Sequence, residues 1–452
     1  MGHHAAFKAG TAEQLEAPGQ PCKLDRELPA LHDEAHMMRT TLTTLAVLGA
    51  TALTACSTMA PSVVGVSHEA MAIHQRLLTL DTHLDTPALF DEPRGYDIMK
   101  LHDVERDGSQ VDLPRMNSGG LDGGFWAIYM GQGPLTPEGY ADIRDKALIR
   151  STSIHEMVAA NPGAFELALT VDDARRIHAA GKKIVFMSME NSYELGDDIT
   201  LIDTFYKLGV RLIGPVHNGT NQLADSANPG SVGAKWGGLS PMGRAFVKRA
   251  NELGMVLDGS HSADTTIEQM IDLSATPIIL SHHGVRALNN HPRNLPDALL
   301  KKMADKGGVI QMNTLFLKTP SPPSSERTAA LKGLNDKYGT VADLTGATYE
   351  AYLDEMGALN RTFPAPMADF EDYMKQILYG IKLLGVDHVG LGGADWDGGG
   401  GLSGYRDITY MPKVTERLMK EGYSEADLNK MWSGNVLRVV KAAEDYAASL
   451  KK

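Results

Sequence analysis

The sequence has little cysteine, no excess of basic residues and no long hydrophobic run. Both cysteines, Cys22 and Cys56, lie in the first 60 of 452 residues. The formal net charge of −13 excludes a nucleic-acid partner, because no basic surplus exists to neutralise phosphates. What remains is ordinary globular composition, 43% hydrophobic and 22% charged, in a chain long enough to bury one large core or two smaller ones.

The one apolar stretch near the N-terminus has the order of a secretion signal. Met37–Cys56 reads "MMRTTLTTLAVLGATALTAC", with Arg39 before the apolar part and small residues before the cysteine. This part is too short and too rich in threonine to span a bilayer, but it suits a signal peptide. "LTAC" resembles the bacterial lipobox, whose cysteine is lipidated and becomes the mature N-terminus. The alternative is a leader on a cytosolic protein.

These features predict three segments. We expect a disordered extension upstream of the true start at 1–36, a lipoprotein signal peptide at 37–55 and the folded domain at 56–452. Cys22 would then be missing from the product and Cys56 lipidated, which leaves no thiol for a disulfide or for catalysis. Ser57 after the cysteine resembles the pattern of outer-membrane lipoproteins. We therefore expect a bacterial envelope protein, lipid-anchored at the outer membrane and facing the periplasm.

Beyond Cys56, short β-like runs alternate with helical patterns. Strands are predicted at 78–85, 125–130, 183–190, 211–217, 255–261, 277–283, 307–313 and 388–395. Helical patterns between them include 140–160, 172–180, 240–254, 264–275, 296–306 and 368–384. Eight such units predict an α/β fold, a (β/α)₈ TIM barrel with a parallel sheet and crossover helices. Residues 318–366 are predicted to be an insertion after strand seven, and 424–450 to be C-terminal helices outside the barrel.

Titratable side chains recur where the predicted strands end. The first strand, in "LTLDTHLDTP", carries His83 and Asp85 at alternate positions, so both side chains point to one face. The full set is His83, Asp85, Glu190, His217, His261, His282 and Asp395. For a single histidine a packing role is the better interpretation. Six strand ends at one level indicate an active site, because the catalytic residues of this barrel lie on the C-terminal rim.

With these residues assembled, the chain resembles the membrane dipeptidase (renal dipeptidase) family of zinc peptidases from about Leu78 to Val440. The motifs that carry the likeness are "DTHLDT", "LGVRLIGPVHNGTNQLADS", "GLSPMGRAFVKRANELGMVLDGSHSA", "IILSHHGVRALNNHPRNLPD" and "GNVLRVV". The resemblance implies a binuclear zinc dipeptidase that hydrolyses small dipeptides, including ones with D-configured C-terminal residues. It also implies a homodimer. From the lipobox-like segment, we expect the chain to reach the membrane only through a lipid anchor at Cys56.

The resemblance assigns metal ligands residue by residue. His83 and Asp85 resemble the ligands of one zinc, His261 and His282 those of the other, and Glu190 the carboxylate that bridges both. Nitrogen and oxygen ligands suit Zn²⁺, and two zinc ions can share a hydroxide that attacks the peptide carbonyl.

The resemblance also assigns three residues to the substrate. Asp395 resembles the group that handles the proton of water, with Asp397 an open alternative because the segment "GLGGADWDG" departs from the family spacing. His217 resembles the group that contacts the scissile carbonyl oxygen. Arg293 resembles the clamp on the free carboxylate, although it could merely pair with a surface acid. Asp81 could brace a metal ligand or cap the strand.

Two other functions stay open. A different metal-dependent amidohydrolase, such as a deacylase or a lactonase, commonly bridges its metals with a carboxylated lysine, but Lys182 and Lys183 lie at the wrong end of the third strand. A non-catalytic lipoprotein would need a decayed ligand set, and every ligand position is filled.

Overall fold

The structure is a computed structural model that describes residues 65–90 and 95–451. The predictions made for the extension at 1–36, for the signal peptide at 37–55 and for Cys56 lie outside the described residues. No helix in the described part of the chain combines the length and the apolar character that crossing a membrane requires.

The strands form a parallel barrel. Eight of them correspond to the predicted strands: β1 Leu80–Leu84, β2 Gly123–Tyr129, β4 Lys183–Glu190, β5 Val210–Ile213, β6 Val256–Leu257, β7 Ile279–Val285, β9 Val309–Met312 and β10 Val389–Gly390. They pair in the orders β1-β2-β4-β5-β6 and β10-β9-β7. Single parallel bridges join the two sheets at Asp258–Ile279 and at Leu84–Trp396. The ring therefore closes in chain order, which confirms the TIM barrel.

Two short strands lie beside this ring and were not predicted. β3 (Phe165–Leu167) pairs with the start of β4, and β8 (Asn294–Leu295) pairs with the end of β7. Each has only two or three residues, which is too short for a periodicity to show in the sequence.

The barrel strands read as apolar runs because both of their faces are covered. All eight residues of β4, "KIVFMSME", are buried, as expected where side chains fill the barrel on one face and meet helices on the other. Glycine allows β2 to approach its neighbours. A Cβ at Gly123 would lie 2.1 Å from the Ile184 carbonyl oxygen, and one at Gly124 would lie 2.2 Å from that of Asp81. The start of β2 therefore has no room for a side chain.

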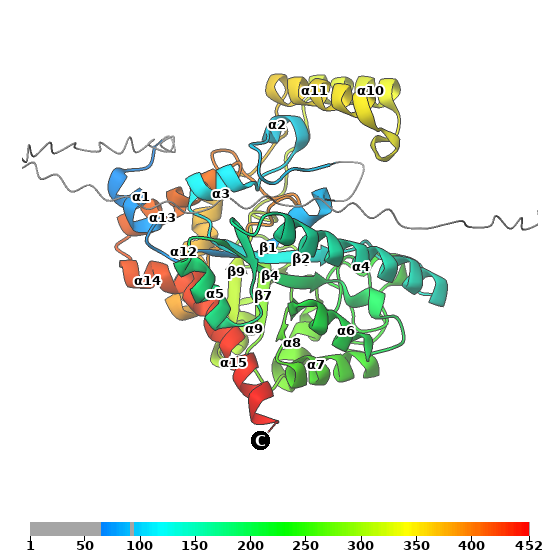
Figure 1. Cartoon of the computed structure of the whole chain (residues 1–452), viewed down its shortest axis with the longest axis vertical. Helices are drawn as coiled ribbons and strands as arrows, with labels where there is room; N and C mark the ends of the chain where they lie inside the picture. The colour runs from blue at the N-terminus through cyan, green and yellow to red at the C-terminus, as the bar shows by residue number, and fades with distance from the viewer. Residues whose placement is uncertain (1–64, 91–94, 452) are drawn as a thin grey trace, which may run out of the picture. The chain divides into compact units, whose positions relative to one another are not determined.

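Helices surround the strands (Figure 1). Their bounds are α1 His68–His74, α2 Val104–Asp107, α3 Leu113–Gly119, α4 Pro137–Ala160, α5 Val171–Ala179, α6 Leu201–Leu208, α7 Pro241–Leu253, α8 Asp264–Leu273, α9 Asp297–Asp305, α12 Phe370–Leu384, α13 Met411–Lys420, α14 Glu425–Asn429 and α15 Asn435–Ser449. Helix α7 shows how the ends are set: Ser240 accepts a hydrogen bond from Gly243 at its start, and Gly254 closes it in the left-handed conformation. The predicted crossover and C-terminal helices are confirmed.

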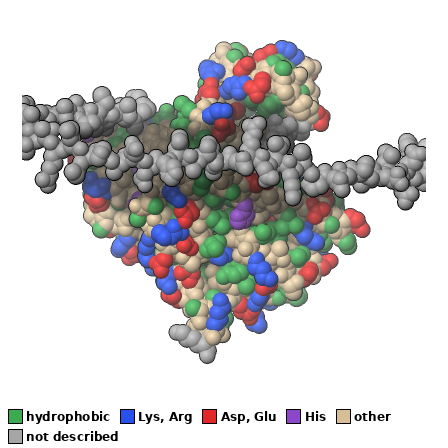
Figure 2. Space-filling model, viewed as in Figure 1, with side chains coloured by type: hydrophobic (Ala, Val, Ile, Leu, Met, Phe, Trp, Pro, Cys, Tyr) green, Lys and Arg blue, Asp and Glu red, His purple; other side chains and the backbone are tan. Residues whose placement is uncertain are grey.

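The predicted insertion is a helical hairpin. Helices α10 (Ser325–Tyr338) and α11 (Gly346–Thr362) lie between β9 and α12, and stand next to α2 at the top of Figure 1. Arg106 of α2 donates to Asp354 of α11 over 2.7 Å, and Asn360 donates to the Glu105 carbonyl oxygen over 2.9 Å. An ion pair and a neutral hydrogen bond thus link this hairpin to α2. On the face shown in Figure 2, acidic and basic side chains are interspersed over the described surface.

Candidate active site

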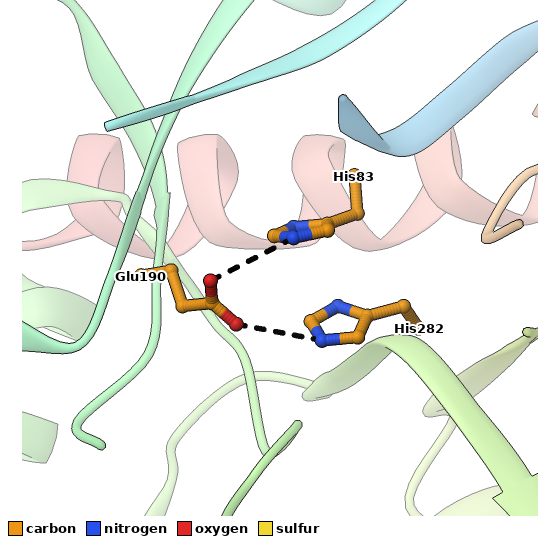
Figure 3. A group of neighbouring side chains, drawn as sticks. All are labelled: His83, Glu190 and His282. Atoms are coloured by element: carbon orange, nitrogen blue, oxygen red, sulfur yellow. Dashed lines mark ion pairs between the residues drawn. The ribbon is translucent and has the colours of Figure 1, made fainter. Parts of the chain in front are cut away.

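Glu190 lies at the centre of the polar cluster on the C-terminal rim. It is the last residue of β4, and its side chain is buried. Its Oε1 lies 2.9 Å from Nε2 of His261 and 3.4 Å from Nε2 of His282, whereas its Oε2 lies 3.7 Å from Nε2 of His83. Figure 3 shows the carboxylate between His83 and His282, with one oxygen toward each ring. The two oxygens therefore face different histidines, while the rings of His83 and His282 stack with centroids 3.9 Å apart.

The second group of side chains comes from the ends of β1 and β10. His83 is in β1, Asp85 follows that strand, and Asp395 follows β10. Nε2 of His83 lies 3.4 Å from Oδ2 of Asp85 and 3.8 Å from Oδ1 of Asp395. Donor atoms within 4.8 Å of one another form three sets, namely His83, Glu190 and His282; Glu190, His217 and His261; and His83, Asp85 and Asp395.

Two of these side chains depend on an unusual backbone. His261 and Asp395 both have φ of 65°, in the left-handed region that L residues seldom adopt. The strands predicted at 255–261 and 388–395 are longer than the observed ones. The regular strand pairing ends at Leu257 in β6 and at Gly390 in β10. Strand 211–217 likewise ends early, at Ile213. The turns after the ladder aim the side chains into the barrel mouth.

The buried carboxyls of the cluster shift one another's protonation and that of His83. Burial, with repulsion from Asp85, raises the pKa of Glu190 to about 8, and burial raises the pKa of Asp395 to about 6. Burial alone would lower the pKa of His83, yet the carboxylates of Asp85, Glu190 and Asp395 raise it well above its usual value. The carboxylates, not the loss of bulk water, therefore favour positive charge at the His83 ring.

The donor set fits a metal. Within the described residues, Oε1 of Glu190 and Oδ1 of Asp85 are buried and have no hydrogen-bond partner. Burial lowers the pKa of His261 and of His282 well below the usual value, so both rings are neutral and present lone pairs. Imidazole nitrogens and carboxylate oxygens that converge in this way are the ligands of Zn²⁺ in catalytic sites.

His217 joins the cluster from the loop after β5. Its ring centroid lies 4.1 Å from that of His261, and its Nδ1 lies 3.3 Å from Oη of Tyr129. Burial and the Arg293 charge lower the pKa of His217 to about 4, so its ring is neutral at pH 7. Burial raises the pKa of Tyr129 to about 12, so this hydroxyl keeps its proton. The pair can hold a defined tautomer of His217 toward the cluster.

Tyr129 is the site residue that the sequence analysis missed. It is the last residue of β2, inside the predicted strand 125–130. Its place at the end of a predicted strand was a usable signal, because any polar side chain at a strand end faces the rim, including a tyrosine hydroxyl.

Arg293 is buried beside the cluster rather than paired at the surface. Its side chain is 2% exposed. Its Nη1 lies 3.4 Å from Nδ1 of His283, its Nη2 lies 3.4 Å from the carbonyl oxygen of His282, and its Nε has no partner among the described residues. Burial lowers the pKa of Arg293 to about 10, with Glu190 and Asp395 opposing the shift. A guanidinium held by long hydrogen bonds keeps capacity for an anionic ligand.

The two aspartates that the sequence could not separate have different surroundings. Oδ1 of Asp395 faces His83, whereas the carboxylate of Asp397 accepts hydrogen bonds from the Thr86 hydroxyl over 2.6 Å and from the backbone N–H of Gln110 over 2.5 Å. Asp397 is therefore tied to the loop and Asp395 to the cluster. Asp81 accepts a hydrogen bond from the His83 backbone N–H over 2.8 Å, which braces that residue.

A parallel barrel with histidines and carboxylates at the C-terminal rim defines a metal-dependent hydrolase. The family model of membrane dipeptidase (peptidase family M19) matches residues 67–452, and the chain belongs to this family. It is a metallo-dipeptidase, a hydrolase that acts on dipeptides.

Known proteins of similar sequence and structure agree. The chain is 28% identical to dipeptidase tcpJ of Claviceps purpurea over 347 residues. This alignment covers 75% of the present chain and 71% of that protein. The probable dipeptidase PvdM of Pseudomonas aeruginosa is 30% identical, with a TM-score of 0.68 over 84% of this chain and 98% of that one. Dipeptidase AC, a metallo peptidase of family M19, is 26% identical, with a TM-score of 0.63 over 81% and 98%.

Proposed function

We propose that the chain is a binuclear zinc dipeptidase and that Glu190 bridges the two ions. The observation that supports this most is the placement of the two oxygens of Glu190, one toward His261 and His282 and the other toward His83. His261 and His282 would complete one site. His83 and Asp85 would complete the other.

When bound, two zinc ions would act as Lewis acids and make a water molecule nucleophilic near neutral pH. Asp395 would take a proton from that water and return it to the leaving amine. This role is supported by its buried carboxyl at the edge of the cluster, whose pKa is raised to about 6.

His217 is suited to the carbonyl oxygen of the scissile bond. If the Tyr129 hydroxyl donates to Nδ1, the ring proton stays on Nε2 and can be donated to the oxygen as negative charge develops there. The low pKa of His217 keeps the ring a neutral donor throughout the physiological range.

Arg293 favours a dipeptide over the substrates of other amidohydrolases. A dipeptide carries its free carboxylate one residue beyond the scissile bond, where a buried guanidinium could bind it. The lysines lie elsewhere: Lys182 pairs with Glu166 over 2.9 Å, and Lys183 donates to the Leu121 carbonyl oxygen over 2.8 Å at the start of β4. Neither is near the place that a carboxylated lysine would need, which speaks against a deacylase or lactonase of that type.

The proposal is tested by metal content together with activity. The zinc-loaded protein should hold about two zinc ions per chain and hydrolyse free dipeptides. Glu190→Ala should weaken both sites, since each loses one oxygen ligand, whereas Glu138→Ala, at an exposed position of α4, should change neither. One tightly held ion in the wild type, with Glu190→Ala binding equally well, contradicts the binuclear site.

We also propose export as a lipoprotein anchored through Cys56 at the outer membrane, on the basis of the sequence "LTAC" after an apolar stretch. Acceptance of D-configured C-terminal residues and a homodimer stay predictions from family resemblance.

A further inference from the structure

Asp258 and Ser281 lie behind the histidine cluster and take no part in the assignments above. Asp258 follows β6 and Ser281 is in β7, at the seam where one parallel bridge, between Asp258 and Ile279, joins the two sheets. Both side chains are buried. The Ser281 hydroxyl lies between the Asp258 carboxylate and the ring of His282.

The contacts of the Asp258 carboxylate determine the direction of each hydrogen bond in this group. Oδ1 of Asp258 accepts from the backbone N–H groups of Ser260 over 2.9 Å and of Ser281 over 3.0 Å. Oδ2 is left to accept from the Ser281 hydroxyl, and the two groups are in contact. An ionised carboxylate only accepts, so the hydroxyl hydrogen points to Asp258. The Ser260 hydroxyl, 3.3 Å away, is the weaker alternative acceptor.

That direction decides the tautomer of His282. With its hydrogen committed to Asp258, the Ser281 oxygen can only accept from Nδ1 of His282, which lies 2.9 Å away. The ring proton must then be on Nδ1, and Nε2 presents its lone pair toward His261 and Glu190. A histidine that binds a metal through Nε2 needs this tautomer.

We propose that Asp258 and Ser281 are positioning residues that preset His282 as a metal ligand through its Nε2. This inference rests on the proposed zinc site. The contrast with His261 supports it, because within the described residues Nδ1 of His261 has no hydrogen-bond partner. One ligand of this pair is thus held by a built hydrogen-bond chain, and the other is not.

Exchange of the carboxylate for an amide gives a sharp expectation. In Asp258→Asn, the two backbone N–H groups require the amide oxygen at the Oδ1 position, which turns the amide nitrogen toward Ser281. The hydroxyl would then accept from this nitrogen and donate to Nδ1 of His282. The ring proton would move to Nε2 and point at the metal position. In the double variant with Ser281→Ala, no hydroxyl enforces this wrong tautomer.

The experiment measures zinc affinity of the full chain by competition with a chelator, using zinc itself as the probe. We expect Ser281→Ala to weaken one of the two sites about 10–100-fold, Ser281→Thr to keep the affinity, and Asp258→Asn to be weaker than Ser281→Ala. The double variant should return to the level of Ser281→Ala. Ser262→Ala is the matched control, since this buried serine adjoins His261 and its hydroxyl has no partner among the described residues.

A second readout is the ¹⁵N shift of His282 in histidine-labelled, zinc-free protein, which should show a protonated Nδ1 in the wild type and a protonated Nε2 in Asp258→Asn. Wild-type affinity in both single variants overturns the inference, as does a double variant weaker than either, which would mean general damage to the seam. A wild type that binds no zinc instead contradicts the proposed function.

Discussion

Arg293 carries its charge in a place where a charge is costly without a ligand. Its side chain is 2% exposed, and its hydrogen bonds to His283 and to the His282 carbonyl oxygen are both 3.4 Å long. A buried guanidinium with weak partners is stabilised when a carboxylate binds it through two parallel hydrogen bonds. The position of Arg293 therefore favours substrates that carry a free carboxylate.

We predict that Arg293→Met lowers kcat/KM for free dipeptides. The loss of transition-state stabilisation should be about 2–5 kcal/mol, because the substrate carboxylate would be desolvated without a partner. Part of the loss should appear in kcat, since the carboxylate positions the peptide carbonyl. Steady-state kinetics on dipeptides and on their C-terminal amides measure both effects.

The wild type should prefer the acids by a similar factor, and Arg293→Met should lose the preference. Arg286→Met is the control, because Arg286 already pairs with Asp264 through both of its terminal nitrogens. Equal cleavage of acids and amides by the wild type would favour the deacylase or lactonase alternative.

At the scale of elements, a buried chain of hydrogen bonds ties α1 to the helices around it. Nε1 of Trp432 donates to Thr415 over 2.9 Å, the Thr415 hydroxyl contacts Nδ1 of His74 over 2.7 Å, and Nε2 of His74 contacts the Gly119 carbonyl oxygen over 3.0 Å. A side chain at Gly120 would clash with the ring, since its Cβ would lie 2.7 Å from Cδ2 of His74. With its proton on Nε2, neutral His74 donates to the Gly119 carbonyl oxygen and accepts from the Thr415 hydroxyl.

We predict that His74 makes the domain sensitive to acid. Burial lowers the pKa of His74 from 6.5 to about 4. Between these values the unfolded chain binds a proton that the folded chain excludes, so this contribution is complete above pH 6.5 and is lost as the pH falls to about 4. The loss is at most about 3.5 kcal/mol, at roughly 1.4 kcal/mol per pH unit.

His74→Gln keeps one donor and one acceptor but does not titrate. The free energy of unfolding from urea titrations should therefore fall less steeply with acid in this variant than in the wild type. His68→Gln, at the exposed start of α1, should follow the wild type. Parallel curves for wild type and His74→Gln would show that the ring is not the titrating group.

At the scale of the whole molecule, the open question is where the domain is delivered. We predict that expression with the native leader gives a membrane-associated protein, and that Cys56→Ala leaves an uncleaved precursor. Acyl chains on the cysteine would anchor the protein firmly, because each buried methylene contributes about 0.8 kcal/mol. Fractionation and mass spectrometry of the N-terminus measure this. A wild type found only in the cytoplasm contradicts the prediction.

The sequence by itself determined the fold and which histidines and carboxylates gather at one rim of the barrel. Alternation of apolar runs with amphipathic segments is enough to place eight parallel strands, because strands covered on both faces must be apolar throughout. In this barrel the C-terminal ends of all strands lie at one rim, so His83, Glu190 and His282 meet there. They do so although more than 100 residues separate His83 from Glu190.

Only the tertiary structure decided the rest, because it depends on contacts between segments distant in the chain. Asp395 differs from Asp397 through what each meets across the barrel, His83 for the first and Thr86 for the second. Tyr129 becomes a site residue through its contact with His217, which lies 88 positions away. Hydrogen bonds are short and directional, so which partner a polar side chain meets is settled only once the strands have closed the barrel.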